Sequence, residues 1–343
     1  MITKNKLSGF IVFALVLGLV SMTFAGDVDR IGTAAGTQLQ QPVSARDIAL
    51  SGANIAMTQG VDALYWNPAG LSRLKGNAIG QFSNVTIFND ISINYLAVGA
   101  NMGDFGAIGF SIKAFDFGDI PLTTNQDMDG ASGKTFSPTF ATTALTYSLS
   151  LSDNIHVGAT AKVVYESIPR AEGTAIAFDA GLQYDNFAGI NGVSFGISIK
   201  NIGSDLKYAG SALTDEVQQD NGRQDVLTRE AASNALPGSI EMGVGYTSNI
   251  DEQNSLTVMT MFQSNNFEYD ALRLGAEYSF DNFIYLRGGY NLTAANSEEQ
   301  LYTFSLGAGI TYNVGGTDLT FDYAFRPVQY FNSDNIFSLS VAF

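Results

Sequence analysis

The sequence predicts an all-β protein: a closed antiparallel transmembrane β-barrel of about fourteen strands, preceded by a short plug-like N-terminal segment. Three observations lead to this fold class. The 343 residues include 36 Gly, 15 Tyr and 24 Phe but only 15% charged residues, a composition typical of a large antiparallel sheet. Residues 77–343 alternate between apolar and polar side chains with the period of a strand. The connections between these predicted strands alternate between long and short.

Residues 1–25 are typical of a secretory signal peptide. Lys4 and Lys6 precede the apolar run 9–20, and small residues lead to an expected cleavage after Ala25. An uncleaved membrane anchor is the alternative. No other stretch reaches the length of about 20 apolar residues that a membrane-spanning helix needs. An exported chain without such a helix can be periplasmic, secreted or an outer-membrane barrel. From this and the strand pattern described below, we expect an exported protein of the outer membrane of a Gram-negative-type bacterium.

The segment 26–76 contains a distinctive sequence motif. Its distinctive residues are Arg46, Gly52, Asp62, Trp66, Asn67, Pro68, Ala69 and Gly70. With this spacing it resembles the N-terminal signature of the PorV/PorQ family and, more distantly, that of the FadL-type outer-membrane transporters, which share the Asn-Pro-Ala-Gly core. The resemblance implies that the segment packs inside the periplasmic mouth of a barrel formed by 77–343. A helix followed by a proline turn is the alternative.

Fourteen strands are predicted in the barrel region. Their ranges are 77–88, 91–102, 104–116, 139–151, 154–167, 174–185, 190–201, 237–248, 254–264, 268–280, 282–292, 301–313, 316–326 and 335–343. The odd-numbered connections include the long ones, 117–138, 202–236, 293–300 and 327–334, whereas the even-numbered connections are short. Outer-membrane barrels have long external loops and short periplasmic turns, so both barrel ends are expected in the periplasm.

The last strand ends on Phe343, with Phe337, Leu339 and Val341 on the same face. This pattern resembles the closing strand of outer-membrane barrels, whose terminal aromatic residue is recognised by the barrel-assembly machinery. An open sheet edge in lipid would leave backbone groups without partners, so the strand is expected to close the barrel. An ordinary edge strand is the alternative.

Charged residues of the strands occupy the polar face. They are Lys162, Glu166, Lys200, Glu241, Arg273, Glu277, Arg287, Asp322 and Arg326. An Arg or Lys that faced the middle of the lipid would cost about 2–4 kcal/mol, so these side chains are expected in the lumen. Lys113 and Asp179 join them. Mixed signs predict cross-strand ion pairs and water, with simple stabilisation of the interior as the alternative to a transport role.

Glycines mark the third predicted strand and its flanks. They are Gly103, Gly106, Gly109 and Gly118. Glycine inside a strand often marks a bulge or a bend. By analogy with FadL-type barrels, in which an interruption of the third strand opens a lateral passage, we expect a lateral opening within 103–118. Simple coiling of the barrel is the alternative.

Neither catalysis nor a cofactor is expected. The chain has no Cys, and its single His156 lies on a polar strand face without a triad around it. The loop 125–130 hints at calcium ligands but lacks the downstream Glu of an EF-hand, and the acidic residues of 215–225 are typical of a solvated surface. A net charge of −16 argues against nucleic acid.

The sequence therefore predicts a non-enzymatic outer-membrane barrel surrounded by lipid. As the PorV/PorQ resemblance implies, the first hypothesis is a role in protein export of a type IX-like kind, with secretion components or exported cargo as partners. The second is a FadL-like passive transporter of hydrophobic small molecules. A purely structural barrel is the third.

Overall fold

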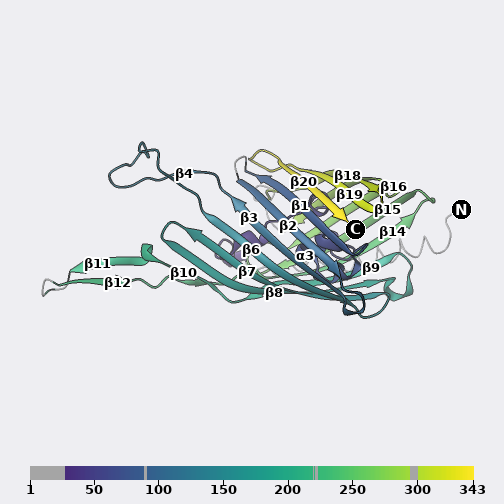
Figure 1. Ribbon diagram of the computed structural model, residues 1–343, viewed down its shortest axis with the longest axis horizontal. Coiled ribbons are helices and arrows are strands. Elements are labelled where there is room, and N and C mark those ends of the chain that lie inside the picture. Colours follow the sequence, from purple (N-terminus) through teal and green to yellow (C-terminus); the bar gives the residue numbers. More distant parts are fainter. Residues whose placement is uncertain (1–27, 89–90, 219, 221–222, 294–299) are drawn as a thin grey trace.

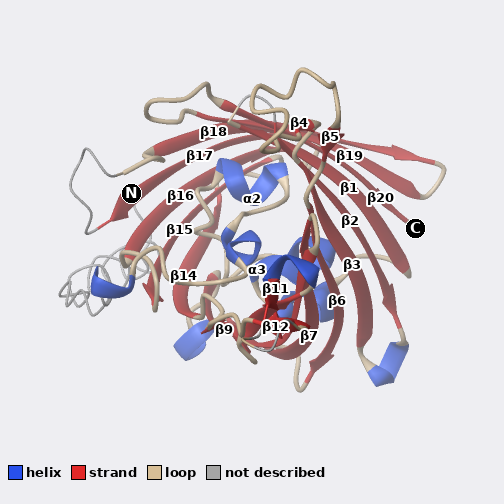
Figure 2. Ribbon diagram, turned by 90° about the vertical axis from the view of Figure 1, so that its left-hand side faces the viewer, coloured by secondary structure: helices blue, strands red, loops and turns tan. Residues whose placement is uncertain are grey.

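The computed structural model describes residues 28–88, 91–218, 220, 223–293 and 300–343. Fourteen antiparallel strands form a closed barrel (Figures 1 and 2). They are β1 Ala78–Ile87, β2 Ile91–Asn101, β3 Ala107–Asp116, β6 Thr139–Ser150, β7 Ile155–Ile168, β8 Ala171–Asp185, β9 Val193–Gly203, β14 Ser239–Asn249, β15 Asn254–Asn265, β16 Ala271–Phe280, β17 Ile284–Thr293, β18 Phe304–Val314, β19 Thr317–Arg326 and β20 Asp334–Ala342. The predicted fold class is confirmed, and each predicted strand matches one of these to within a few residues.

The pairing of β1 with β20 closes the ring. Its register runs from Ile79 opposite Ala342 to Thr86 opposite Asn335. Phe343 continues the ladder, because its N–H donates to the carbonyl of Ala78 at 2.9 Å. The terminal strand is therefore paired on both edges, by β1 and by β19.

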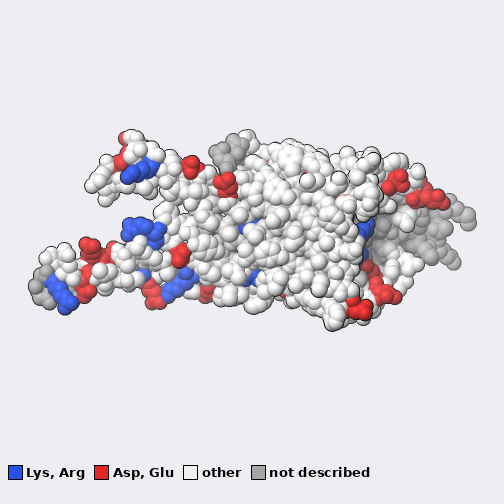
Figure 3. Space-filling view, in the orientation of Figure 1, with Lys and Arg blue, Asp and Glu red and all other residues white. Residues whose placement is uncertain are grey.

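Apolar side chains cover the outside of the barrel. They include Leu96, Phe110, Leu145, Ile176, Ile240, Leu306, Phe321 and Leu339, all of them more than a third exposed. On the face seen in Figure 3, charged side chains lie towards the two ends of the molecule and leave the middle almost free of them. Such a band suits hydrocarbon, whereas the inward faces carry the polar residues. No helix among the described residues is both long and apolar enough to span a membrane.

The two ends of the barrel differ. At one end, short turns join the strands, including the 3-10 turns η5 Gly103–Phe105 and η6 Phe187–Gly189. The other end carries the long connections and extends into hairpins (Figure 1). These are β4 Ile120–Pro121 with β5 Thr135–Phe136, β10 Leu206–Ala209 with β13 Ser233–Asn234, and, beyond η7 Ser211–Leu213, β11 Thr214–Gln218 with β12 Gln224–Thr228. We refer to them as the short-turn end and the long-loop end.

The N-terminal segment folds inside the lumen (Figure 2). After η1 Val28–Arg30 it forms η2 Thr37–Gln40, α2 Ala45–Ala49, η3 Gly60–Asp62, α3 Ala63–Trp66 and η4 Pro68–Arg73. We call residues 35–74 the plug. Its helix α2 packs against β17–β20 and its turn η4 against β6–β8. The main apolar core lies between the plug and the wall, where Ile48 and Leu64 meet Val85 and Ile93. The predicted signal peptide, 1–25, lies outside the described residues.

Inward-facing glycines let the wall approach the plug. They are Gly99, Gly109, Gly158, Gly181, Gly196, Gly243, Gly245, Gly275, Gly289 and Gly307, which we call the glycine collar. A Cβ on Gly181 would lie 2.0 Å from the side-chain oxygen of Asn67, and one on Gly158 would lie 2.4 Å from the carbonyl carbon of Pro68. Any larger residue would collide with the plug there. The collar lies nearer the short-turn end on most of its strands, so the plug lies mainly in that half of the lumen.

Candidate functional site

The Asn-Pro-Ala-Gly motif attaches the plug to the wall. The side-chain oxygen of Asn67 accepts from the N–H of Ala69 at 3.2 Å and so caps η4, which begins at Pro68. The side-chain nitrogen of Asn67 donates to the carbonyls of Ile55 at 2.9 Å and Leu182 at 3.2 Å. One asparagine therefore joins the turn, the plug and β8. An aspartate could not donate these two bonds.

The other motif residues hold the plug in shape. Trp66 donates its indole N–H to the carbonyl of Val43 at 3.2 Å. Asp62 accepts from the Ser44 hydroxyl at 2.6 Å and from the Gln81 amide at 2.7 Å, the latter on β1. Gly52 adopts a positive φ of 76°. Gly70 lies so close to the plug backbone that a Cβ would come within 2.1 Å of the Thr58 carbonyl oxygen.

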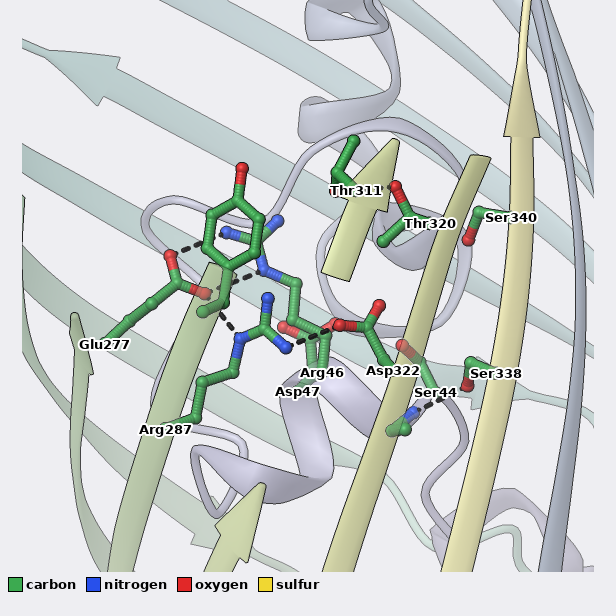
Figure 4. A network of polar contacts seen from close by, with 12 residues as sticks. Ser44, Arg46, Asp47, Glu277, Arg287, Thr311, Thr320, Asp322, Ser338 and Ser340 are labelled. Carbon is green, nitrogen blue, oxygen red and sulfur yellow. Dashed lines mark hydrogen bonds and ion pairs between the residues drawn. The ribbon is translucent and has the colours of Figure 1, made fainter. Parts of the chain in front are cut away.

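Arg46 connects the plug to a chain of charges on the wall (Figure 4). Its guanidinium lies 3.2 Å from the carboxylate of Glu277 on β16. Glu277 is also paired with Arg287 on β17 at 2.6 Å, and Arg287 is paired with Asp322 on β19 at 2.5 Å. Glu277 raises the pKa of Arg46, so the arginine stays charged. Next to it, burial and the nearby Asp62 raise the pKa of Asp47 to about 7.

The remaining inward-facing charges predicted from the sequence are also inside the barrel. Lys162 is paired with Asp179 at 2.5 Å, and Lys200 with Glu241 at 3.0 Å. Glu166 accepts from the hydroxyl of Tyr208. Arg326 is paired with Asp334 at 2.6 Å, a partner that we did not predict because Asp334 comes before the predicted start of its strand. Lys113 donates to the carbonyl of Gln41 on the plug at 2.9 Å.

A second polar cluster, not predicted from the sequence, lies at the short-turn end. Arg73 of the plug is 3.1 Å from the carboxylate of Asp185, which lies 3.6 Å from His156 Nε2. His156 Nδ1 is 2.8 Å from the Ser150 hydroxyl and 3.2 Å from that of Ser72. The cluster joins η4 to the ends of β6, β7 and β8. No pattern in the sequence brings these positions together.

Acidic residues in both loops have partners within their own loops. The carboxylate of Asp127 accepts from the N–H groups of Ala131 at 2.8 Å and Ser132 at 2.9 Å, so it caps its own turn. Asp215 pairs with Arg229 at 2.6 Å. Within the described residues, no group of three or more His, Asp or Glu side chains is placed to hold a metal.

A cavity of about 650 Å³ lies above the plug, towards the long-loop end. Its floor is the plug, with Leu39, Ile48, Tyr65 and Trp66. Its walls come from β9 and β14–β19 with the connections between them, and include Lys200, Glu241, Arg273, Asn291, Tyr302 and Arg326. Aromatic and aliphatic carbon therefore shares this surface with amide, hydroxyl and charged groups. Volumes of this size hold small-molecule ligands.

The wall beside this cavity has an incomplete ladder. The pairing of β9 with β14 ends at Lys200 opposite Ser239, and the pairing of β10 with β13 starts again at Leu206 opposite Asn234. Between them lie the segments 201–205 and 235–238, which the described structure does not pair with each other; we call this the wall gap. The Asn201 side chain bridges it by donating to the Pro237 carbonyl at 3.0 Å.

Apolar side chains close the inner side of the wall gap. Leu39 of the plug meets Leu206 and Leu236 from the two edges of the gap, and all three are buried. We call these three residues the apolar seal. Leu39, Asn201 and Pro237 also line the cavity, so the cavity and the seal are adjacent. The neighbouring outer surface is apolar, with Ile202 55% exposed.

The third strand shows no comparable interruption. β3 pairs with β2 from Ala107 to Asp116 and with β6 from Ala107 to Phe115. The four glycines noted in the sequence have other roles. Gly103 and Gly106 turn the chain at positive φ, Gly109 makes room for Leu64 of the plug, and Gly118 lies in the loop beyond the strand. β3 is therefore paired without interruption from Ala107 to Phe115 on both edges, and the lateral opening expected within 103–118 stays a prediction.

Comparison with known proteins gives matches in structure only. No family model and no curated protein sequence matches the chain. Among solved structures, the Pseudomonas putida toluene transporter TodX is 13% identical, with a TM-score of 0.52 over 86% of this chain and 96% of TodX. A Pseudomonas aeruginosa FadL homologue is 12% identical, with a TM-score of 0.51 over 88% and 98% of the two chains.

A third match is the monoaromatic hydrocarbon channel CymD, at 14% identity and a TM-score of 0.50 over 88% of this chain and 96% of CymD. At these identities the likeness concerns the fold alone. None of the three is described as a PorV or PorQ protein or as a secretion component. The chain shares the barrel fold of these three solved structures.

Proposed function

We propose that this protein is a FadL-like passive transporter that carries hydrophobic small molecules across the outer membrane. The observation that carries the proposal is the cavity above the plug, which ends at the wall gap and its apolar seal. A ligand in the cavity would have the plug below it and the side chains of Leu39, Leu206 and Leu236 beside it. Movement of three apolar side chains costs less than removal of the plug from its collar and ion pairs. The route therefore leads sideways into the lipid.

A reversible crosslink tests this route. Lys207 and Ser233 are directly opposite each other in the β10–β13 pairing, and the natural chain has no Cys. Cysteines at both positions should form a disulfide that fixes the far edge of the wall gap. The measurement is accumulation of radiolabelled toluene by intact cells that express the protein, corrected for cells without it. We expect oxidation to abolish protein-dependent uptake and a reductant to restore it.

The matched control places cysteines at Ser92 and Asp116, which are opposite each other on β2 and β3 at the long-loop end. This disulfide should leave uptake unchanged. Uptake that is blocked by the control pair and not by the Lys207–Ser233 pair would place the opening at 103–118 instead. Uptake that neither disulfide affects would contradict a lateral route.

A second candidate function, a PorV/PorQ-like role in protein export, is favoured by the hairpin β11–β12. It projects from the long-loop end, and Val217, Val226 and Leu227 on it are 42%, 64% and 57% exposed. A lone two-stranded hairpin is marginal in water, and a protein partner would cover it. A photo-crosslinker at Val226 in intact cells tests this. Capture of a secretion component or of an exported domain supports the role, whereas capture of lipid alone contradicts it.

A further inference from the structure

Arg273 differs from the other cations that face the lumen. Its counterparts Lys162, Lys200, Arg287 and Arg326 each form an ion pair with a carboxylate, and Lys113 donates to a backbone carbonyl. Within the described residues, Arg273 forms neither an ion pair nor a hydrogen bond, although it lies in the wall of the cavity. The carboxylates that attract it, Glu241 and Glu268, lie beyond ion-pair distance.

The guanidinium of Arg273 lies close to the plug. A Cβ on Gly52 would lie 2.8 Å from Arg273 Nη1 and 2.5 Å from a ring carbon of Trp66. The guanidinium therefore extends from the wall to the plug, where it lies near the indole ring of Trp66. Glu241 is already held by Lys200 at 3.0 Å, and Glu268 is exposed. Among the described residues, neither carboxylate approaches Arg273 closely enough to form an ion pair with it.

An unpaired guanidinium in such a cavity favours an anion. Partial removal of a guanidinium from water costs free energy, and this cost is offset only by a counter-charge or by hydrogen-bond acceptors. The planar fork of an arginine fits a carboxylate with two parallel hydrogen bonds. A bare hydrocarbon in the cavity would make neither, and would leave Arg273 further from water than before.

The rest of the cavity favours a flat ligand. Tyr65 and Trp66 meet edge to face on the floor, with ring centroids 5.1 Å apart and planes at 81°. On the wall, Tyr302 packs against the guanidinium of Arg326 at 3.8 Å. Aromatic rings pack well against such surfaces. Because the plug forms the floor of a cavity of about 650 Å³, the ligand has to be compact.

We propose that this cavity binds a compact aromatic carboxylate, with its carboxylate on Arg273 and its ring against Trp66. The inference rests on the proposed transport function and names the class of cargo that the same cavity selects. Neutral aromatic molecules occupy the same space more weakly, because they leave the guanidinium without a partner.

Trp66 provides the readout, since it is the only Trp in the chain. Purified full-length protein in detergent is titrated with benzoate, with toluene and with heptanoate, a linear acid with the same number of carbons as benzoate, while the indole fluorescence is recorded. We expect benzoate to bind at least about tenfold more tightly than either of the others. Arg273→Gln should weaken benzoate binding about 10- to 100-fold and leave toluene unchanged, as expected for loss of a hydrogen bond between charged groups.

Two further variants separate binding from folding. Arg273→Lys keeps the charge without the planar fork, and should weaken benzoate less than Arg273→Gln does. Arg229→Gln, on the distant hairpin arm, should bind all three probes as the natural protein does. Equal benzoate affinity in the natural protein and Arg273→Gln, preference for toluene, or no response to any probe would each overturn the proposal.

The outcome is distinguishable from that of the transport proposal. Selective benzoate binding together with unchanged uptake after oxidation of the Lys207–Ser233 pair would keep the ligand site and refute the lateral route. Uptake that the disulfide blocks, together with no benzoate preference, would keep the route and refute the ligand class.

Discussion

Replacement of Glu277 by Gln tests whether the ion pairs that join Arg46 to Glu277, Arg287 and Asp322 hold the plug in the barrel. Glu277 accepts from Arg46 on the plug at 3.2 and 3.3 Å and from Arg287 at 2.6 Å, and its own side chain is nearly buried. Gln has the same shape but no charge. Arg287 keeps Asp322, so the main effect is that Arg46 loses the carboxylate of its ion pair. Breaking one side of a buried pair costs about 3–5 kcal/mol, and the retained amide oxygen reduces this to about 2–3 kcal/mol.

The assay is urea unfolding of the purified protein in lipid vesicles. Fluorescence of Trp66 reports on the plug, and the shift between boiled and unboiled bands on a gel reports on the barrel. We expect the fluorescence transition of Glu277→Gln to occur at lower urea concentration than in the natural protein. The plug transition should move further than the barrel transition, because the wall retains its ladders.

The matched control is Glu230→Gln, which removes an exposed ion pair with Lys207 at the long-loop end. Surface pairs contribute little, so this variant should unfold as the natural protein does. A fluorescence transition for Glu277→Gln that coincides with the natural one would refute the reasoning, since Arg46 would then be held by other contacts.

Two further predictions concern the collar and the plug interior. Gly158→Leu should displace η4 and expose the plug to added protease. The control is Gly80→Leu, where a Cβ would meet no atom closer than 4.0 Å and the plug should stay protected. Equal cleavage of the two variants would contradict the role of the collar in seating the plug. Burial raises the pKa of Asp47 from 3.8 to about 7, so its contribution to stability is full below about pH 4 and is lost as the pH rises through 7. Asp47→Asn should remove this pH dependence, so the free energy of unfolding should decrease less between pH 4 and pH 8 than in the natural protein. A variant with the same pH profile as the natural protein would contradict the assignment to Asp47.

The strands and their faces were predictable because side chains of a barrel strand alternate between the lipid and the lumen, so apolar and polar residues alternate in the sequence. In β7, for example, Val163 faces outward and is 44% exposed, whereas its neighbour Lys162 is 6% exposed. Strand ends were less accurate where the backbone turns, as at η5, which replaces the predicted start of β3. The motif predicted a plug, although the sequence alone could not show which strands it touches.

Contacts between distant segments were beyond sequence reasoning. The polar faces contain Gly158, Gly275 and Gly307, and these glycines are the one visible sign of the collar, but glycine on a strand face does not show what packs against it. Likewise, Arg46 could not be paired with Glu277 from the sequence, because 231 positions separate them. The wall gap depends on where two ladders stop, which no local pattern indicates.

The central claim is that the plug seals the lumen while cargo leaves through the wall. Planar-bilayer conductance of the purified full-length protein tests the seal most directly. We predict no steady ion current for the natural protein, and the appearance of current in Gly158→Leu, where the plug no longer fits. Stepwise, porin-like conductance of the natural protein would contradict the claim.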